Sequence, residues 1–152
     1  MISCYNESME TVIGFTGTSK GLSLEQEIGL ATILVEARKD CLWMHNGDCV
    51  GADASAGKIW NKLGGFIHLH PPINQTARAF LTHEMSEVKK EYLVRNRDIV
   101  ATCDFMIATP GEMNEQLRSG TWATVRYARK ANKDIIFIFP DGEIKLETNG
   151  DK

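Results

Sequence analysis

Short apolar segments alternate with segments of helical periodicity along most of this 152-residue chain, and no other feature limits its fold as much. Five apolar segments have the length and composition of buried strands: residues 11–15, 41–45, 66–70, 104–109 and 134–139. Four segments have apolar residues at helical spacing: 24–38, 53–63, 88–103 and 121–131. Strands that alternate with helices form a parallel sheet covered on both faces. The sequence therefore predicts an α/β fold, a three-layer sandwich with a mostly parallel sheet of about five strands.

Residues at the element boundaries agree with this assignment. Ser23 is a suitable N-cap for the helix that follows it, and the glycine pair 64–65 ends the next helix. Residues 73–86 have the least regular pattern and predict a loop with a short helix. The polar segment from about residue 145 predicts a frayed tail. No repeat or composition shift divides the chain, so we expect one domain over residues 1–152.

Composition and charge exclude several classes of protein. The net charge of −3 and pI near 5.8 disfavour a general binder of nucleic acid, which needs a basic face. No apolar run is long enough to span a bilayer and no secretory segment is recognisable, so we expect a cytoplasmic protein without membrane contact. The four cysteines form no CxxC pair and are expected to be reduced thiols.

Three glycine-containing loops each follow a predicted strand and precede a predicted helix. They are Thr16-Gly17-Thr18, residues 47–53 and residues 118–124. The first N–H groups of a helix lack internal partners and suit an anion. In a parallel sheet the carboxyl ends of the strands share one edge, where ligands bind at the reversal of strand order. The loops together predict a site for a nucleotide-like ligand, although each glycine could instead serve only a tight turn.

Polar side chains in and beside these loops suit the parts of a nucleotide. Arg95 is a natural bidentate partner for phosphate. Asp48 lies in its turn and could accept ribose hydroxyls, whereas Asp53 has the position of a helix cap. Trp122 is equally compatible with stacking on a base and with packing in the core. The predicted ligand-binding set is Thr16, Gly17, Thr18, Gly47, Asp48, Gly51, Ala52, Arg95, Asn96, Thr109, Pro110, Ser119, Gly120, Thr121 and Trp122.

Two histidines and one cysteine are of residue types that can bind a metal ion or act as a nucleophile. Alternation along a strand puts His68 and His70 on one face, where they could form a metal pair or simply pack and hydrogen-bond. No third ligand has a telling spacing, so we expect no metal site and no resident cofactor. Cys49 has no histidine placed by the sequence to activate it, so we do not expect a nucleophile.

Five motifs, taken in order, resemble those of the SLOG superfamily. They are GFTGT at 14–18, HNGDCVGADA at 45–54, HPP at 70–72, RNRDIV at 95–100 and SGTWAT at 119–124. This superfamily of Rossmann-like proteins includes the LOG nucleotide phosphoribohydrolases and the DNA-processing protein DprA. The resemblance implies a Rossmann-like fold and assembly as a homo-oligomer. SLOG domains of anti-phage systems are considered sensors of nucleotide-derived signals, and some phage proteins sequester such signals.

The chain departs from the LOG enzymes at the residue that carries their catalysis. LOG enzymes have the pattern Pro-Gly-Gly-x-Gly-Thr-x-x-Glu, and aligning Gly120-Thr121 with it places Thr124 at the glutamate. Arg95 keeps the spacing of the LOG arginine. A threonine cannot stabilise an oxocarbenium-like transition state or activate water. Arg95 and Glu112 are the remaining catalytic candidates, with Glu115 and Asp48 as further carboxylates.

The resemblance and the loops together give three functional hypotheses. The first is a protein that binds a nucleotide or NAD-derived molecule, as a sensor or sequestering protein, without turnover. The second is a nucleotide N-glycosidase or 5′-monophosphate phosphoribohydrolase of the LOG type. The third is DprA-like binding of single-stranded DNA, which the acidic balance disfavours.

Overall fold

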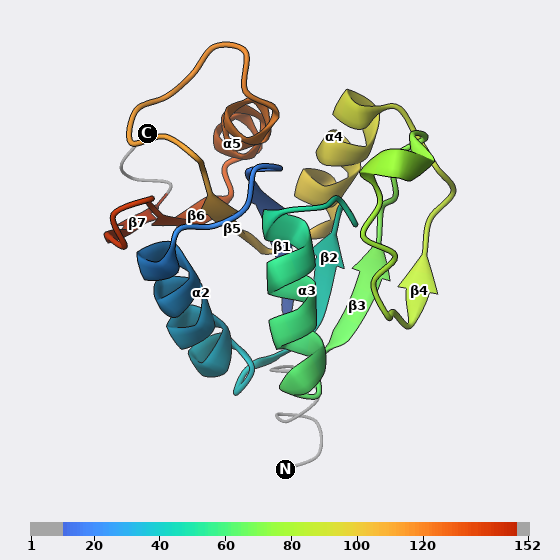
Figure 1. The fold of residues 1–152 in the computed structure, drawn as a ribbon, viewed down its shortest axis with the longest axis horizontal. Coiled ribbons are helices and arrows are strands. Elements are labelled where there is room, and N and C mark those ends of the chain that lie inside the picture. Colours follow the sequence, from blue (N-terminus) through green and yellow to red (C-terminus); the bar gives the residue numbers. More distant parts are fainter. Residues whose placement is uncertain (1–10, 149–152) are drawn as a thin grey trace.

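The computed structural model describes residues 11–148, which fold around one seven-stranded sheet (Figure 1). Its strand order is β4-β3-β2-β1-β5-β6-β7, with all pairs parallel except β6 and β7. The strands are β1 (Thr11–Gly17), β2 (Cys41–Asn46), β3 (Phe66–Leu69), β4 (Met85–Ser86), β5 (Phe105–Thr109), β6 (Asp134–Ile138) and β7 (Ile144–Glu147). The predicted mostly parallel α/β fold is confirmed.

Helices cover both faces of the sheet, as the alternating pattern predicted. The helices are α2 (Leu24–Ala37), α3 (Ala52–Lys62), α4 (Tyr92–Thr102) and α5 (Gly120–Lys130), with a 3-10 turn, η1, at Gln75–Ala77. Figure 1 shows α2 and α3 below the row of strands and α4 and α5 above it, on opposite sides of the sheet. No helix within the described range has the length and apolar character that a membrane crossing requires.

The sheet has two strands more than the expected number. β4 has only two residues and lies in the irregular segment, and α4 begins at Tyr92 instead of residue 88. β7 lies where a frayed tail was expected, so that expectation is wrong for residues 145–147. A turn at Gly142 (φ 89°) folds β7 back antiparallel to β6, and Arg129 of α5 pairs with the Glu147 carboxylate at 2.9 Å. Residues 149–152 of the predicted tail lie outside the described residues.

Two apolar cores lie on the opposite faces of the sheet. The core beneath α2 and α3 contains the fully buried Leu30 and Trp60, whose indole N–H donates to backbone carbonyls of β2 and β3. The core beneath α4 and α5 contains Trp122 stacked against Phe137, with ring centroids 5.9 Å apart. A sheet with both faces covered explains why its strands are continuous apolar runs.

The strand order reverses between β1 and β5, which are neighbours at the centre of the sheet. At their carboxyl ends Gly17 pairs with Thr109. A Cβ at Gly17 would lie 2.2 Å from the Thr109 hydroxyl and 2.5 Å from Cβ of Ala52, so glycine is required for this close approach. The sheet edge expected to bind a ligand is therefore closely packed beneath its loops.

Helix α2 provides a direct test of the core assignment. Leu30 is fully buried, whereas Leu24 of the same helix is 68% exposed. We expect Leu30→Ala to lower the free energy of unfolding by about 2–5 kcal/mol, because the substitution leaves a cavity. Leu24→Ala, the matched control, should change it by less than about 0.5 kcal/mol. Urea unfolding measures both values, and similar losses in the two variants would contradict the assignment.

Candidate functional site

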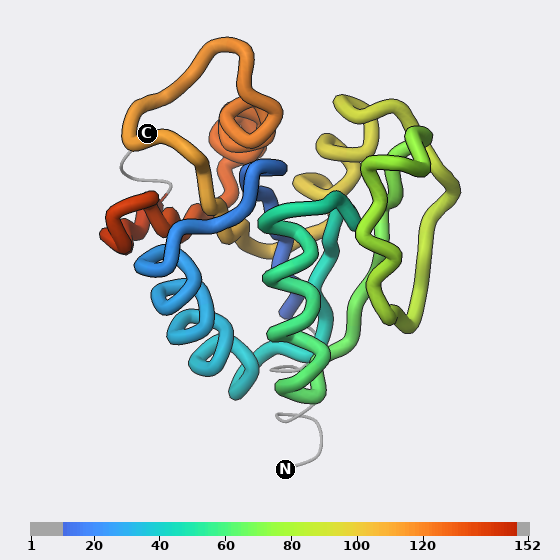
Figure 2. The backbone as a smooth tube through the Cα atoms, viewed as in Figure 1, coloured from blue at the N-terminus to red at the C-terminus, as the bar shows by residue number. Residues whose placement is uncertain are grey.

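A cavity of about 370 Å³ lies at the carboxyl ends of β1 and β5, within the size range of small-molecule sites. Figure 2 shows how three segments meet there: the blue turn after β1, the orange loop before α5, and the start of α5. Tyr92, at the start of α4, completes the wall. The lining residues are Gly17, Thr18, Ser19, Lys20, Tyr92, Gly111, Glu112, Gln116, Arg118, Ser119, Gly120 and Thr121.

The N-terminus of α5 opens directly into this cavity. Ser119 is the N-cap, and its hydroxyl accepts a hydrogen bond from the Trp122 amide at 3.2 Å. The amides of Gly120 and Thr121 have no hydrogen-bond partner among residues 11–148. A Cβ at Gly120 would come within 2.7 Å of the Tyr92 ring, so only glycine lets that ring approach the helix end. Two free amides and the positive end of the helix dipole suit an anion.

Two cations and one carboxylate set the charge of the cavity. Within the described part of the chain, the side chains of Lys20 and Arg118 have no hydrogen-bond or ion-pair partner. The carboxylate of Glu112 accepts a hydrogen bond from the Trp122 indole at 3.0 Å. Because the acid is held by Trp122 while both cations are unpaired, the cavity favours a negatively charged ligand.

The second glycine loop supports the cavity without lining it. Four of its amides, those of Asp48, Cys49, Val50 and Ala52, donate to protein acceptors, the Asn46 amide oxygen, the Asp53 carboxylate, Ala77 O and Thr18 O. Gly51 has φ 93°, and a Cβ there would lie 2.5 Å from Ser19 O. The predicted contribution of Gly47, Gly51 and Ala52 to ligand binding is therefore not supported, because this loop is packed beneath the first one.

Asp48 is fully buried and does not face the cavity, contrary to its predicted role toward ribose. Its carboxylate accepts hydrogen bonds from Arg78 Nε at 2.7 Å and from the Leu81 amide at 2.9 Å. Both donors belong to the irregular segment between β3 and β4, whose course the sequence pattern did not reveal. Asp48 therefore fixes that segment to the end of β2.

Arg95 is also buried, with 2% of its surface exposed, and it does not line the cavity. Its guanidinium donates to three oxygens and one sulfur, those of Gly47 O, His70 O, the Asn96 side chain and Cys49 Sγ. Its face lies 4.4 Å from the centre of the Tyr92 ring. The predicted phosphate contact of Arg95 and Asn96 is thus replaced by contacts within the protein. The same burial weakens Arg95 as a catalytic candidate.

Asp53 lies beside this guanidinium in the interior. Burial raises the pKa of its carboxyl to about 6, although the charge of Arg95 acts in the opposite direction. The Asp53 carboxylate accepts the Cys49 amide at 3.2 Å, a local contact at the start of α3. Asp53 therefore stabilises the start of α3 and provides a carboxyl group close to the buried Arg95 cation.

Other predicted residues are buried close to the cavity. Thr16 and Thr109 lie within the sheet, and the carbonyl of Pro110 accepts a hydrogen bond from the Gln26 side chain at 2.8 Å. Trp122 is 3% exposed, so of its two interpretations the structure selects packing in the core. Thr124 donates its hydroxyl to Gly120 O at 3.0 Å, inside its own helix.

The cavity therefore contains part of the predicted set and several residues that sequence reasoning missed. The predicted residues that line it are Gly17, Thr18, Ser119, Gly120, Thr121 and Glu112. The missed residues are Ser19, Lys20, Tyr92, Gly111, Gln116 and Arg118. Lys20 and Arg118 could have been found from their position, because Arg118 lies in the predicted loop 118–124 and Lys20 follows the loop 16–18 by two residues. Tyr92 was missed because its helix was expected to begin at residue 88, which puts Tyr92 inside the helix instead of at its start.

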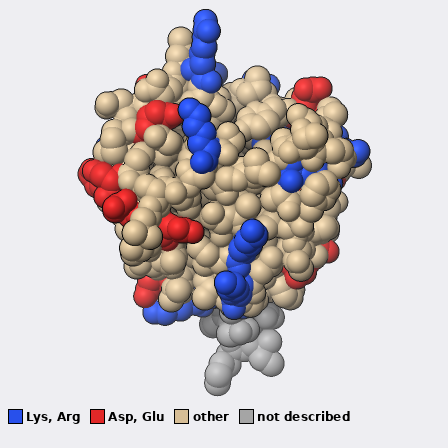
Figure 3. All heavy atoms as spheres, viewed as in Figure 1, with Lys and Arg blue, Asp and Glu red and all other residues tan. Residues whose placement is uncertain are grey.

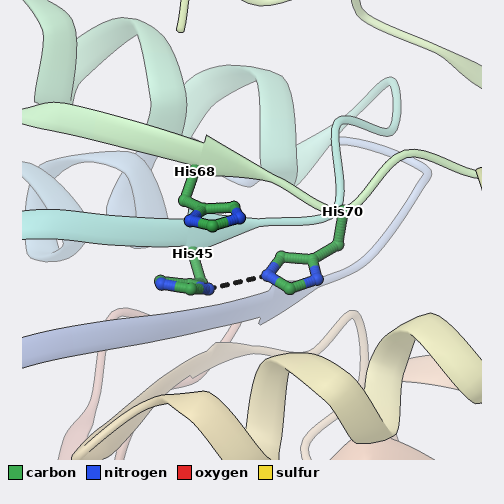
Figure 4. A group of neighbouring side chains, drawn as sticks. All are labelled: His45, His68 and His70. Atoms are coloured by element: carbon green, nitrogen blue, oxygen red, sulfur yellow. Dashed lines mark hydrogen bonds between the residues drawn. The ribbon is translucent and has the colours of Figure 1, made fainter. Parts of the chain in front are cut away.

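Three histidines form a second group of polar residues, on the sheet face beside α4. The parallel register pairs His45 of β2 with His68 of β3, and His70 follows two residues later (Figure 4). His45 Nδ1 lies 2.7 Å from His70 Nε2, and the rings of His68 and His70 stack 5.2 Å apart. One ligand atom from each ring lies within 4.8 Å of the others, a spacing from which a metal ion could be held. The sequence spacing showed no third ligand beside His68 and His70, and the register of β2 with β3 supplies one candidate, His45.

Protonation of His45 and His70 is disfavoured in the folded state. Burial and the neighbouring imidazoles lower the pKa of His45 to about 3, and burial with His68 lowers the pKa of His70 to about 4. The unfolded chain takes up protons below about pH 6.5. This contribution to stability is therefore complete above pH 6.5 and is lost as the pH falls toward 4.

We expect acidification from pH 7 to pH 5 to lower the free energy of unfolding through these two groups. The loss should be roughly 1 kcal/mol for each histidine after allowance for screening by solvent. Urea unfolding with EDTA present measures it, and His45→Gln should reduce the pH dependence. An equal pH dependence in the wild type and the variant would contradict this assignment.

Comparison with known proteins identifies the fold but no sequence family. No protein-family model matches the chain, and no curated protein matches it in sequence. DNA processing protein A from Helicobacter pylori is similar in structure, with a TM-score of 0.65 and 19% identity over 90% of this chain and 68% of that one. Its structure is described as showing a unique single-stranded DNA binding mode.

Two molybdenum cofactor proteins have the same architecture. The molybdenum cofactor binding protein from Rippkaea orientalis has a TM-score of 0.66 and 19% identity, over 86% of this chain and 77% of that one. The molybdenum cofactor carrier protein from Chlamydomonas reinhardtii has a TM-score of 0.63 and 17% identity, over 84% and 76%. This chain therefore shares the α/β fold of these proteins, with a mostly parallel sheet between helices.

Proposed function

We propose that this protein is a member of the SLOG superfamily that binds a phosphorylated, nucleotide-like small molecule in the cavity at the start of α5. The observation that carries the proposal is the pair of free amides at Gly120 and Thr121, next to the unpaired side chains of Lys20 and Arg118. A phosphate at this point would receive two backbone hydrogen bonds and two charge-assisted contacts.

The rest of the cavity suits the uncharged part of such a ligand. Tyr92 is 42% exposed, and the Arg95 guanidinium supports the ring from within the protein. An aromatic ring at the cavity wall offers a stacking surface for a base. Thr18 and Gln116 supply polar side chains on the opposite loops. Ribose hydroxyls would be contacted there, since Asp48 is buried elsewhere.

The structural neighbours support a phosphate-containing ligand of modest size. Single-stranded DNA and the molybdenum cofactor, named for those neighbours, both contain phosphate. Lys and Arg side chains on the face shown in Figure 3 are separated from one another and interspersed with acidic ones, without a continuous basic strip. A long nucleic acid needs such a strip, so a small ligand fits this face better.

The cavity supports binding better than hydrolysis. Thr124, at the position of the LOG glutamate, is buried and bonded to its own helix. Glu112 is the one carboxylate among the lining residues, and Trp122 holds it. Binding without turnover is the behaviour of a sensor or a sequestering protein. Base release that Glu112→Gln abolishes would instead establish the hydrolase.

Binding can be tested with a thermal-shift screen followed by calorimetry. The panel contains mononucleotides, NAD, ADP-ribose, cyclic ADP-ribose isomers and a short single-stranded DNA. A ligand at one hundred times its Kd should add about 2.7 kcal/mol to stability. Lys20→Ala and Arg118→Ala should each weaken binding of the selected ligand by roughly 10-fold, because each removes a charge-assisted contact. Lys58→Ala, on the exposed side of α3, is the matched control.

Each outcome of this screen has a definite meaning. Equal affinity in wild type, Lys20→Ala and Arg118→Ala would place the ligand elsewhere on the molecule. Chromatography of the mixtures separates binding from hydrolysis, because an intact ligand supports a binding protein and free base supports an enzyme. Stabilisation by DNA alone would favour the DprA-like hypothesis.

A further inference from the structure

The three histidines beside α4 lie apart from the cavity proposed for the phosphorylated ligand. His45 and His68 are register partners on neighbouring parallel strands, and His70 lies on the same face two residues beyond His68. Figure 4 shows the three rings converging between the strand ends and the helix. From this arrangement we infer that His45, His68 and His70 bind one divalent transition-metal ion, with zinc as the reference ion.

The distances among the rings are close to those of a three-histidine metal site. One ligand atom from each ring lies within 4.8 Å of the other two. Nitrogens bound to a tetrahedral zinc at 2.0–2.1 Å lie roughly 3.3 Å apart. The rings therefore need shifts on the order of 1 Å, achieved by side-chain rotation on a fixed sheet. The register of β2 with β3 brings His45 beside His68, although the two residues are distant in sequence.

A cavity of about 250 Å³ adjoins the rings and provides room for an ion and its waters. It is lined by the three histidines, Glu87, Lys90, Asp98, Ala101 and Thr102. The Glu87 carboxylate lies 2.7 Å from His68 Nε2, so it can orient that ring or become a fourth ligand. Asp98 is paired with Lys90 at 2.6 Å. Imidazole with one carboxylate suits zinc, nickel, cobalt or iron.

A purely structural role leaves one polar atom of the cluster unexplained. His70 Nδ1 is buried and has no hydrogen-bond partner among residues 11–148. Buried polar atoms without a partner are rare in folded proteins, because each loses its bonds to water. Burial of three imidazoles side by side also costs free energy, because these polar rings lose their hydrogen bonds to water. A metal ion accounts for the convergence of the rings, because it binds one nitrogen lone pair from each imidazole.

The metal site and the phosphate cavity are joined through one side chain. The His70 carbonyl accepts a hydrogen bond from Arg95 at 3.2 Å, and Arg95 also supports the Tyr92 ring. The ion would therefore stiffen the ends of β2 and β3 beneath Arg95. This inference does not depend on which ligand occupies the cavity at α5.

The test uses the full chain, stripped with EDTA and titrated with zinc by calorimetry and with cobalt by visible absorption. We expect one ion per chain and a rise in melting temperature when zinc is added. His45→Gln and His68→Gln should weaken zinc binding at least 100-fold, and Glu87→Gln by 10–100-fold. His83→Gln, which alters the fourth histidine of the chain, is the matched control and should bind as the wild type does.

Two results would overturn the inference. One is a wild-type protein that binds no zinc, cobalt, nickel or iron(II) at 100-fold excess over protein. The other is zinc binding that survives in His45→Gln and His68→Gln but is lost in His83→Gln. Circular dichroism of each variant establishes that it is folded, and nucleotide binding, measured in parallel, reports separately on the proposed function.

Discussion

The buried guanidinium of Arg95 joins the parts of the molecule on which both candidate sites depend. It contacts the end of β2 through Gly47 O, the end of β3 through His70 O and its own helix through Asn96. Burial of a cation is costly unless its donors are satisfied, and here its donors meet three oxygens and the Cys49 sulfur. Removing it would leave the Gly47 and His70 carbonyls without this donor, and the buried Asp53 carboxylate without a nearby positive charge.

This arrangement gives the two glycine loops at helix starts different roles. The amides of the loop before α3 donate to Thr18 O, Ala77 O and neighbouring side chains, so this loop supports the cavity and has few donors left for a ligand. The start of α5 leaves its first amides free, and Tyr92, resting on Arg95, forms the wall beside them. A helix start becomes an anion site only where the chain leaves its donors unused.

The fold could be predicted from the sequence because its determinants are local and periodic. Apolar strands, the Ser23 cap and the glycine breaks indicated the order of elements, while β4 and β7 are short or polar and gave no such signal. The site was predicted only in part. Parts of two predicted loops, Gly17-Thr18 and residues 118–121, line the cavity. Asp48 and Arg95 instead have polar partners distant in sequence, and residue type alone does not distinguish a buried ion from a ligand contact. The group of three histidines could likewise not be predicted without knowing the register that pairs His45 with His68.

The free amides at the start of α5, and not those of the second glycine loop, are the donors that we propose for the phosphate. The most direct measurement is a titration of ¹⁵N-labelled protein with a nucleotide that binds, followed by two-dimensional NMR. We expect large shifts for the Gly120 and Thr121 amides and small ones for Asp48 and Cys49. Large shifts at Asp48 and Cys49, with Gly120 and Thr121 unchanged, would contradict it.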